Sequence, residues 1–425
     1  MKRNVLQGKF GKNVVLITSG AAVAQIINIA LSPIITRLYT PDEYGIISVF
    51  TAVIASLGFV GSFNFEMGIP IAADDKTAFK VLTLSTITLI ISTLLLSTIL
   101  GLFGVELLHL LDGVELINYI YLIPLGLLLK GLYNILIQWA YRSKDFKSIT
   151  KTKFGQSFSQ NFISILMGIL GTGPIGLIIG KILGQSAGIT TLTYPLIKNR
   201  KQIFDNFNLK ELSSVAYRYK EFPLYTTPRR YLGDITISLP VLFITSLYGS
   251  GVVGFFGLAN SVIQLPMNII GTSISNVYYA ECASLRNTNP LRIKELSDKL
   301  LKVLVIIGIV PLGILIIFGP QLFSFVFGSE WLDAGNYARL LSVSIFFRFI
   351  FKPISNIFDI FEKQKVAFWL NILRVALVFI TFLISRALEL NSYWYVGIYS
   401  ISMAVIYLLQ YLLARSIILS EYSGV

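Results

Sequence analysis

The chain has 425 residues, of which 54% are apolar and only 13% are charged, and its formal net charge is +13. This composition excludes an ordinary soluble domain, which needs far more charged surface. A single cysteine, Cys282, and a single histidine, His109, leave no Cys/His cluster for zinc, no thiol–imidazole dyad and no intramolecular disulfide. In a soluble protein the positive charge would suggest nucleic acid, but here membrane topology explains it, so we expect no nucleic-acid partner.

Long apolar segments follow one another along the whole chain. Each is long enough to cross the ~30 Å hydrocarbon core as a helix, and none shows the ten-residue alternating pattern of a transmembrane β-barrel. We therefore expect an all-α integral membrane protein with about twelve transmembrane helices. The predicted spans are 13–37, 44–70, 79–104, 116–141, 153–171, 174–197, 223–248, 252–279, 299–320, 335–361, 366–388 and 392–416.

Basic residues are concentrated at the N-terminus and in alternate gaps between these spans. The gap after the fourth span contains Arg142, Lys144 and Lys147, whereas the gaps on the opposite side contain few cations. Because Lys and Arg are retained in cytoplasmic loops, the pattern predicts that both termini lie in the cytoplasm.

The two halves of the sequence repeat one pattern. Tyr39 is followed after five residues by Gly45, and Tyr248 is followed after five residues by Gly254. This predicts two six-helix bundles related by a pseudo-two-fold axis along the membrane normal, with a central cleft between them. The predicted parts are an N-terminal bundle at 1–197, a cytoplasmic amphipathic linker at 198–222 and a C-terminal bundle at 223–425.

Two further patterns concern packing. The linker carries apolar residues at near-helical spacing, and its basic residues would favour anionic lipid headgroups along the inner leaflet. These apolar residues are Phe204, Phe207, Leu212, Val215 and Tyr219. In the sixth span, glycines recur every fourth residue from Gly176 to Gly188, which predicts a ridge for close helix packing.

Charged residues within the predicted spans are the best indicators of function. A charge at mid-membrane costs about 2.5 kcal/mol or more, so such residues normally face a polar cavity or a partner. Arg348 and Lys352 are four residues apart on one helix face, which is unfavourable unless an anion or water is nearby. We therefore expect an anion-facing wall. The charged residues within or near spans are Glu66, Lys130, Lys181, Asp234, Arg348, Lys352 and Arg374.

Several of these residues have a second interpretation that the sequence leaves open. Asp234 is four residues from Arg230, so it either forms an ion pair with it or takes part in ion coupling. Lys130 and Lys181 either contact substrate or extend toward a carbonyl or the membrane surface.

The sequence resembles a known family over essentially its whole length. Residues 36–45 read Thr-Arg-Leu-Tyr-Thr-Pro-Asp-Glu-Tyr-Gly, similar to the Arg-Leu-Tyr-Ser/Thr-Pro-Glu-Glu-Phe-Gly element after the first helix of Wzx-type polysaccharide repeat-unit flippases. Residues 64–69, Asn-Phe-Glu-Met-Gly-Ile, are similar to that family's Arg-Tyr-Glu-x-Ala-Ile element. Glu66 is retained, whereas Asn64, Phe65 and Gly68 depart from the element. Phe222-Pro223 and the stretch from Phe327 to Trp331 match further elements in the same order.

This resemblance implies the multidrug/oligosaccharidyl-lipid/polysaccharide (MOP) exporter superfamily, with two bundles around a V-shaped cavity. It implies a transporter rather than an enzyme, without catalytic residues or a bound cofactor. The implied substrate is an undecaprenyl-pyrophosphate-linked oligosaccharide that crosses the bacterial inner membrane during synthesis of O-antigen, capsule or a related polysaccharide. Implied partners are membrane lipids and glycan polymerase or assembly proteins.

Within this family, the cationic residues would bind the pyrophosphate, and carboxylates would couple transport to an H⁺ or Na⁺ gradient. We expect the wall to contain Arg348, Lys352, Arg374 and Arg37, with Lys130 and Lys181 as further candidates. An ion pair of Arg37 with Asp42 or Glu43 is an equally good interpretation of that residue. The candidates for coupling are Glu66, Asp234 and Asp359.

Two other functions are less consistent with the sequence. A drug or cation exporter of the same fold should have an acidic or aromatic cavity, whereas the charges in these spans are mainly positive. A membrane glycosyltransferase or polymerase would be expected to carry a large outer loop or an Asp-x-Asp pair, and the sequence has neither.

Overall fold

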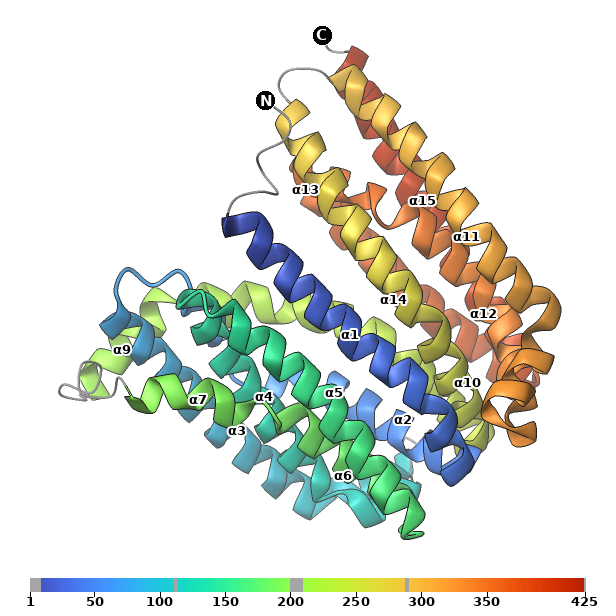
Figure 1. The fold of residues 1–425 in the computed structure, drawn as a ribbon, viewed down its shortest axis with the longest axis horizontal. Helices are drawn as coiled ribbons and strands as arrows, with labels where there is room; N and C mark the ends of the chain where they lie inside the picture. Colours follow the sequence, from blue (N-terminus) through green and yellow to red (C-terminus); the bar gives the residue numbers. More distant parts are fainter. Residues whose placement is uncertain (1–8, 111–113, 199–208, 287–289, 424–425) are drawn as a thin grey trace. The chain divides into compact units, whose positions relative to one another are not determined.

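The computed structural model describes residues 9–110, 114–198, 209–286 and 290–423 (Figure 1). Within these residues the chain is helical and has no strand, which confirms the all-α prediction. The chain divides into two compact units, unit 1 at 1–238 and unit 2 at 239–425. This division falls inside one long helix, α10, while the predicted bundle limits at 197 and 223 stay predictions.

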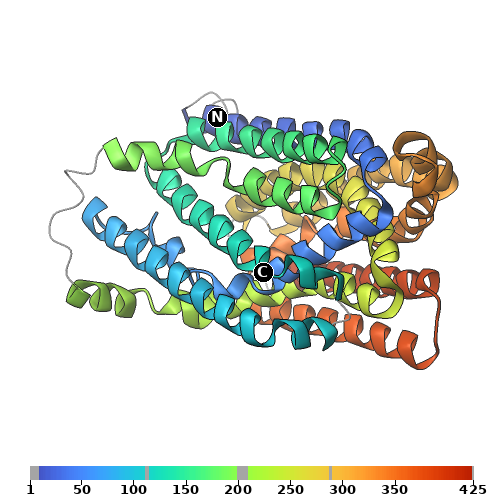
Figure 2. The ribbon, with the colours of Figure 1, turned by 90° about the horizontal axis from the view of Figure 1, so that it is seen from below.

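Unit 1 is a bundle in which α1 runs along α5 and α5 runs along α6 (Figures 1 and 2). The other helices complete it, with α4 in contact with α3, α5, α6 and α7. The helices of unit 1 are α1 (Lys9–Leu38), α2 (Pro41–Ser56), α3 (Asp75–Leu110), α4 (Leu122–Arg142), α5 (Phe146–Ile169), α6 (Pro174–Ser186), α7 (Ile189–Lys198), α9 (Leu209–Arg218) and the first part of α10 (Thr227–Leu285).

Unit 2 is built around α12, which packs against both α11 and α15. Helix α14 packs on α15, and a short helix, α13, follows a bend after α12. The helices of unit 2 are the rest of α10, α11 (Pro290–Phe327), α12 (Leu332–Phe351), α13 (Ile357–Ile360), α14 (Gln364–Ala387) and α15 (Ser392–Ser423).

Eight helices of the described part are long and apolar enough to cross a membrane, and a ninth is obtained if the pair containing α12 and α13, bent by 46°, is one span. One of the eight, Phe222–Leu285, contains two predicted spans, which meet at Gly249 in a non-helical conformation with φ of 81°. The predicted spans 44–70 and 153–171 do not qualify, because α2 has only 16 residues and α5 is rich in polar residues. The number twelve therefore stays a prediction.

Apolar side chains cover the outside of several helices. Leu102 on α3 and Ile306 on α11 are 66% and 67% exposed, and neighbouring Leu, Ile and Phe residues on both helices are similarly exposed. In water such continuous apolar faces would cause aggregation, whereas hydrocarbon solvates them. The chain is a multi-pass membrane protein.

The second predicted span, 44–70, is not one continuous helix. Helix α2 ends at Ser56, and two 3₁₀ turns follow, η1 (Gly58–Val60) and η2 (Phe65–Gly68). Between the turns Phe63 and Asn64 adopt positive φ values of 50° and 58°, which no α-helix allows. The prediction of a continuous helix here is wrong, because hydropathy does not detect a break whose flanking residues are still mostly apolar.

Side chains from other helices satisfy the backbone that this break exposes. Ser92 of α3 donates to the carbonyl oxygen of Gly61 at 2.8 Å, and Thr227 of α10 donates to that of Phe63 at 2.9 Å. Arg142 of α4 donates to the carbonyl oxygen of Ala72 at 2.7 Å. Irregular backbone at membrane depth is stable only when it is satisfied in this way.

The glycine ridge of α6 packs against α5, as the sequence predicts. A Cβ added at Gly184 would lie 2.8 Å from the Cα atom of Gln160, and one at Gly180 would lie 3.0 Å from the carbonyl oxygen of Gln160. The two helix backbones are therefore too close for any larger side chain at these positions.

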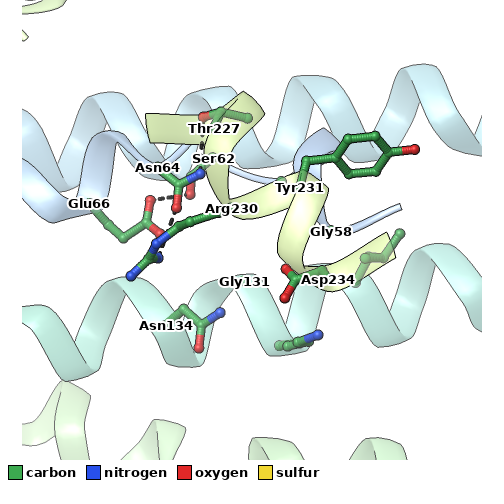
Figure 3. A pocket seen from close by; sticks show the side chains of 13 residues that line it. Gly58, Ser62, Asn64, Glu66, Gly131, Asn134, Thr227, Arg230, Tyr231 and Asp234 are labelled. Carbon is green, nitrogen blue, oxygen red and sulfur yellow. Dashed lines mark hydrogen bonds between the residues drawn. The ribbon is translucent and has the colours of Figure 1, made fainter. Parts of the chain in front are cut away.

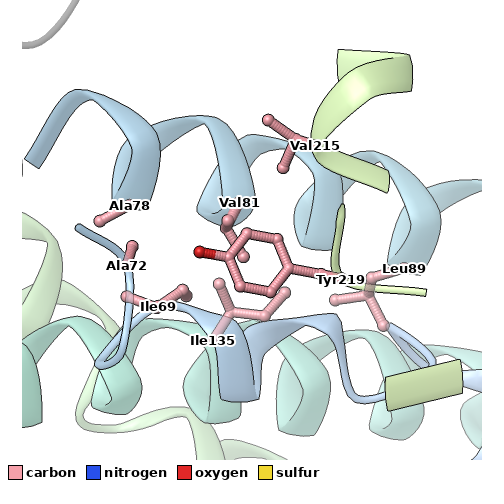
Figure 4. Packing of buried hydrophobic residues seen from close by; sticks show 8 residues of the cluster. All are labelled: Ile69, Ala72, Ala78, Val81, Leu89, Ile135, Val215 and Tyr219. Carbon is pink, nitrogen blue, oxygen red and sulfur yellow. The ribbon is translucent and has the colours of Figure 1, made fainter. Parts of the chain in front are cut away.

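Helix α9 lies beside α3 in both overall views (Figures 1 and 2). The Tyr219 ring, just after α9, and Val215 are buried among Ile69, Val81 and Ile135 (Figure 4). Leu212 is also buried, whereas Phe204 and Phe207 lie outside the described residues. Protein, rather than lipid, covers the apolar side of α9.

Candidate functional site

Each unit contains a cavity with charged residues in its wall, lined by residues of that unit alone. The unit 1 cavity, of about 130 Å³, lies between the break after α2, helix α4 and the start of α10. The unit 2 cavity, of about 170 Å³, lies between the later part of α10 and the end of α12. Both cavities contain residues that the sequence singles out as charges within spans.

In unit 1 the break after α2 places Glu66 in the cavity wall. The side chain is only 6% exposed, and its carboxylate accepts a short hydrogen bond from the Ser62 hydroxyl (Figure 3). The positive charge of Arg230 also acts on Glu66. A buried carboxylate of this kind is held by a neighbouring donor and a cation, which lower the cost of its burial.

A chain of hydrogen bonds joins this break to the start of α10. The Asn64 amide donates from Nδ2 to Thr227 Oγ1 at 3.0 Å and accepts at Oδ1 from Arg230 Nη1, also at 3.0 Å (Figure 3). Because one amide bridges a hydroxyl and a guanidinium, it fixes the orientation of Arg230 toward Glu66.

Lys130 on α4 and Asp234 on α10 line the same cavity, and their charges attract each other. Among the described residues no ion pair within 4 Å involves Asp234, and Arg230 binds Asn64 instead. The cavity thus contains two carboxylates, Glu66 and Asp234, and two cations, Lys130 and Arg230. Its formal charge is balanced.

The unit 2 cavity has a different charge. Arg348 Nη1 donates to Gln264 Oε1 at 2.7 Å, and Lys352 lies one helical turn further along the same wall. The neighbouring polar groups are the neutral side chains of Asn268, Thr272 and Ser275. Among the described lining residues there is no carboxylate, so the charge of this cavity is positive.

Arg374 on α14 adds a third positive charge nearby without lining the cavity. Its guanidinium lies over the Tyr407 ring, 5.1 Å from the centroid. Two of its nitrogens, Nε and Nη2, are buried without a hydrogen-bond partner among the described residues. The charge of Arg374 acts on Lys352, as does that of Asp359 on α13. Buried guanidinium donors without a partner, close to other positive charges, favour the binding of an anion.

The remaining candidate residues lie outside both cavities. Arg37 is exposed at the end of α1, and Glu43, one of its possible partners, accepts from the Thr40 backbone amide at 2.8 Å in a capping box at the start of α2. Lys181 on α6 does not line the unit 1 cavity, although it is close enough to Lys130 for their charges to repel each other.

Neutral amides also line both cavities, and they are not among the residues predicted from the sequence. Asn64 and Asn134 line the unit 1 cavity, and Gln264 and Asn268 line that of unit 2. Charged residues alone do not reveal these amides. An amide within a span also costs free energy in hydrocarbon, so its presence in the sequence indicates a polar site. Among the described residues no group of His, Cys, Asp or Glu could hold a metal ion.

Comparison with known proteins gives a family and a fold. The sequence matches the family model described as "Polysaccharide biosynthesis protein" over residues 34–336. A search of curated proteins gave no significant match.

Several solved structures share the fold at low sequence identity. An inward-facing multidrug resistance MATE family transporter of the MOP superfamily is 16% identical with a TM-score of 0.73, over 95% of this chain and 99% of that one. The lipid II flippase MurJ in an inward closed conformation is 17% identical with a TM-score of 0.73, over 94% and 87% of the two chains. A MOP superfamily transporter from Pyrococcus furiosus, described as having a binding pocket of reverse polarity, is 17% identical with a TM-score of 0.61, over 98% of each chain.

At these identities the structures establish the fold. The family model covers well over half of the chain. The protein therefore belongs to the polysaccharide biosynthesis protein family and has the fold of MOP superfamily membrane transporters.

Proposed function

We propose that the protein is a flippase that moves a lipid-linked oligosaccharide, with the glycan attached to undecaprenyl pyrophosphate, from the cytoplasmic to the outer leaflet of the bacterial inner membrane. The transported glycan is then used to build O-antigen, capsule or a related polysaccharide. The family supports a role in polysaccharide synthesis, and the fold supports transport.

The observation that carries this proposal is the cationic cavity of unit 2. A pyrophosphate cannot enter hydrocarbon without compensation, and guanidinium and ammonium groups are its natural partners. Arg348 and Lys352 supply both groups from adjacent turns of one wall, and Arg374 brings further positive charge. Neighbouring cations on one helix face repel each other, and a bound anion would offset this repulsion.

Transport against a gradient needs an energy source, and we propose coupling to H⁺ or Na⁺. Glu66, Asp234 and Asp359 are the candidate carboxylates, two of them in the unit 1 cavity. Partners in glycan polymerisation, and a cytoplasmic location of both termini, are part of the same proposal.

Export of organic cations is the alternative for this fold. A cationic drug would be repelled by Arg348 and Lys352, and the described lining of the unit 2 cavity offers it no carboxylate. The observed charge therefore favours the flippase.

The test compares cells that lack the protein with cells that carry it. We expect the deletion strain to accumulate lipid-linked oligosaccharide facing the cytoplasm, measured by the accessibility of the glycan to a membrane-impermeant lectin in inside-out and right-side-out vesicles. Wild type should relieve the accumulation, whereas Arg348→Ala and Lys352→Ala at matched expression should not. Lys299→Ala is the control, because Lys299 is an exposed lysine of unit 2 outside the cavity.

Each outcome has a separate meaning. Rescue by both cavity variants would remove the proposed anion wall but not the flippase. A deletion strain without accumulation would overturn the flippase and favour the cation exporter.

A further inference from the structure

The unit 1 cavity is polar but does not suit an anion. Glu66 and Asp234 both line it, so a phosphate or other anion would meet two carboxylates at short range. The cavity also does not suit a bare cation, because Lys130 and Arg230 line it as well. A ligand of this cavity should therefore be neutral overall and rich in hydrogen-bonding groups.

Three side chains in this cavity have no hydrogen-bond partner among the described residues. They are Lys130 and Asn134 on α4 and Asp234 on α10. Figure 3 shows Asn134 and Asp234 directed toward the same space from the two helices. The ammonium group only donates, the carboxylate only accepts, and the amide does both.

Hydroxyl groups are the natural complement of such a set. Each hydroxyl donates one hydrogen bond and accepts others, so a ring with several hydroxyls can bind a carboxylate, an amide and an ammonium group together. Tyr231 also lines this cavity. At about 130 Å³ the cavity is also roughly ten times the ~10–15 Å³ that one water needs.

The opposite wall of the cavity is preorganised. Ser62, Asn64 and Arg230 are joined to Glu66 or to one another by hydrogen bonds or charge, and Thr227 fixes the amide of Asn64. Fixed polar groups give specificity, whereas the three unpartnered groups are available to a ligand. Part of the cavity lining is thus held in place by hydrogen bonds, and another part has donors and acceptors without a hydrogen-bond partner among the described residues.

We infer that the unit 1 cavity is a carbohydrate subsite, in which Lys130, Asn134 and Asp234 bind the hydroxyls of one uncharged sugar residue of the transported glycan. This inference rests on the proposed function. It assigns recognition of the sugar to unit 1 and recognition of the anionic group to unit 2. Selectivity for one glycan then depends on which hydroxyls these three side chains meet, because a site built to bind a hydroxyl rejects a ligand that lacks it.

The test measures binding of two probes to the full-length protein in lipid nanodiscs. One probe is polyprenyl pyrophosphate, and the other is the same lipid carrying a single neutral sugar, tested as a hexose, a 6-deoxyhexose and an N-acetylhexosamine. We expect wild type to bind at least one glycosylated probe about tenfold or more tightly than the bare lipid, which corresponds to one or two hydrogen bonds to charged groups.

The variants separate the two cavities. Asn134→Leu and Asp234→Asn should each reduce the preference for the glycosylated probe, measured as the ratio of its affinity to that of the bare lipid. Arg348→Ala should weaken binding of both probes by the same factor. Asn336→Leu, at an asparagine outside both cavities, controls for folding.

Equal affinity of wild type for all probes, or a preference that survives Asn134→Leu and Asp234→Asn, would overturn the carbohydrate subsite while leaving the flippase intact. Failure of wild type to bind any of the lipids would overturn the proposed function and the inference with it.

Discussion

The cavities of the two units both contain charged side chains but differ in net charge. In unit 1, Glu66 and Asp234 balance Lys130 and Arg230, whereas in unit 2 the described lining has Arg348 and Lys352 without a carboxylate. The two cavities would therefore favour different ligands, because ligand chemistry depends on a few side chains rather than on the helices that present them. Each cavity can therefore be disturbed separately.

Charge reversal in unit 2 should have the largest effect. Arg348→Glu would place a carboxylate beside Lys352 and oppose the anion. We expect transport of the lipid-linked glycan to fall by at least about 30-fold, since removing one partner of a desolvated charge pair costs about 2–5 kcal/mol. Arg348→Lys keeps the charge and should retain part of the activity. The measurement is the translocation rate in proteoliposomes, and equal rates for Arg348→Glu and wild type would contradict a cationic role for this cavity.

Helix packing in unit 2 should matter next. A Cβ at Gly335 of α12 would lie 2.5 Å from the carbonyl oxygen of Gly319 and 2.6 Å from the nitrogen of Pro320, both backbone atoms of α11. Gly335→Ala should therefore separate the helix that carries Arg348 from α11 and destabilise unit 2 by about 1–3 kcal/mol.

The control for this prediction is Gly313→Ala on α11, where nothing lies within 4 Å of an added Cβ. Thermal unfolding of the purified protein compares the two. If both variants have the melting temperature of wild type, the close approach of α11 and α12 does not determine the stability of unit 2, which contains the cavity.

In unit 1 the amide of Asn64 should contribute a similar amount, through its hydrogen bonds and through its backbone. Asn64→Ala removes the bonds to Thr227 and Arg230 and also places alanine at φ of 58°, so we expect a loss of about 1–3 kcal/mol. Asn64→Gly removes the same bonds without the backbone strain and should cost less. Chemical unfolding monitored by tryptophan fluorescence distinguishes them, and equal losses would show that the positive φ is unimportant.

The smallest effects on stability should come from low pH. In each unit they should arise from protonation of one carboxylate that lies outside the spans. Hydrogen bonds from the Thr77 backbone amide and hydroxyl lower the pKa of Asp74, and a hydrogen bond and the charge of Arg286 lower the pKa of Glu362. Because both folded-state pKa values lie below the unfolded ones, the stabilisation is complete above the unfolded values of about 4 and is lost as the pH falls through the folded values.

Asp74→Asn and Glu362→Gln should each remove part of this pH dependence. Melting temperatures measured between about pH 3 and pH 7 provide the check. A pH profile that neither substitution alters would mean that these two carboxylates do not contribute to acid sensitivity.

The sequence predicts the helical fold well because hydrophobic length is a local property. The glycine ridge of α6 and the adjacent cations Arg348 and Lys352 are also local patterns, and the structure has them on single helix faces. The sharing of one cavity by Glu66, Lys130 and Asp234 is not local, because it depends on the break after α2. That break results from hydrogen bonds with residues far along the chain, such as Thr227, and no window of the sequence contains both partners.

The break after α2 also has a consequence for the order in which the protein is made. Its exposed carbonyl oxygens accept hydrogen bonds from Ser92, Arg142 and Thr227, which are synthesised 31, 70 and 164 residues later than the groups they bind. Until those residues leave the ribosome, the segment between Gly58 and Ala73 has no protein partner for these groups and is unstable in hydrocarbon. The backbone of this break can therefore be fully satisfied within the membrane only after Thr227, near the start of the seventh predicted span, has been synthesised.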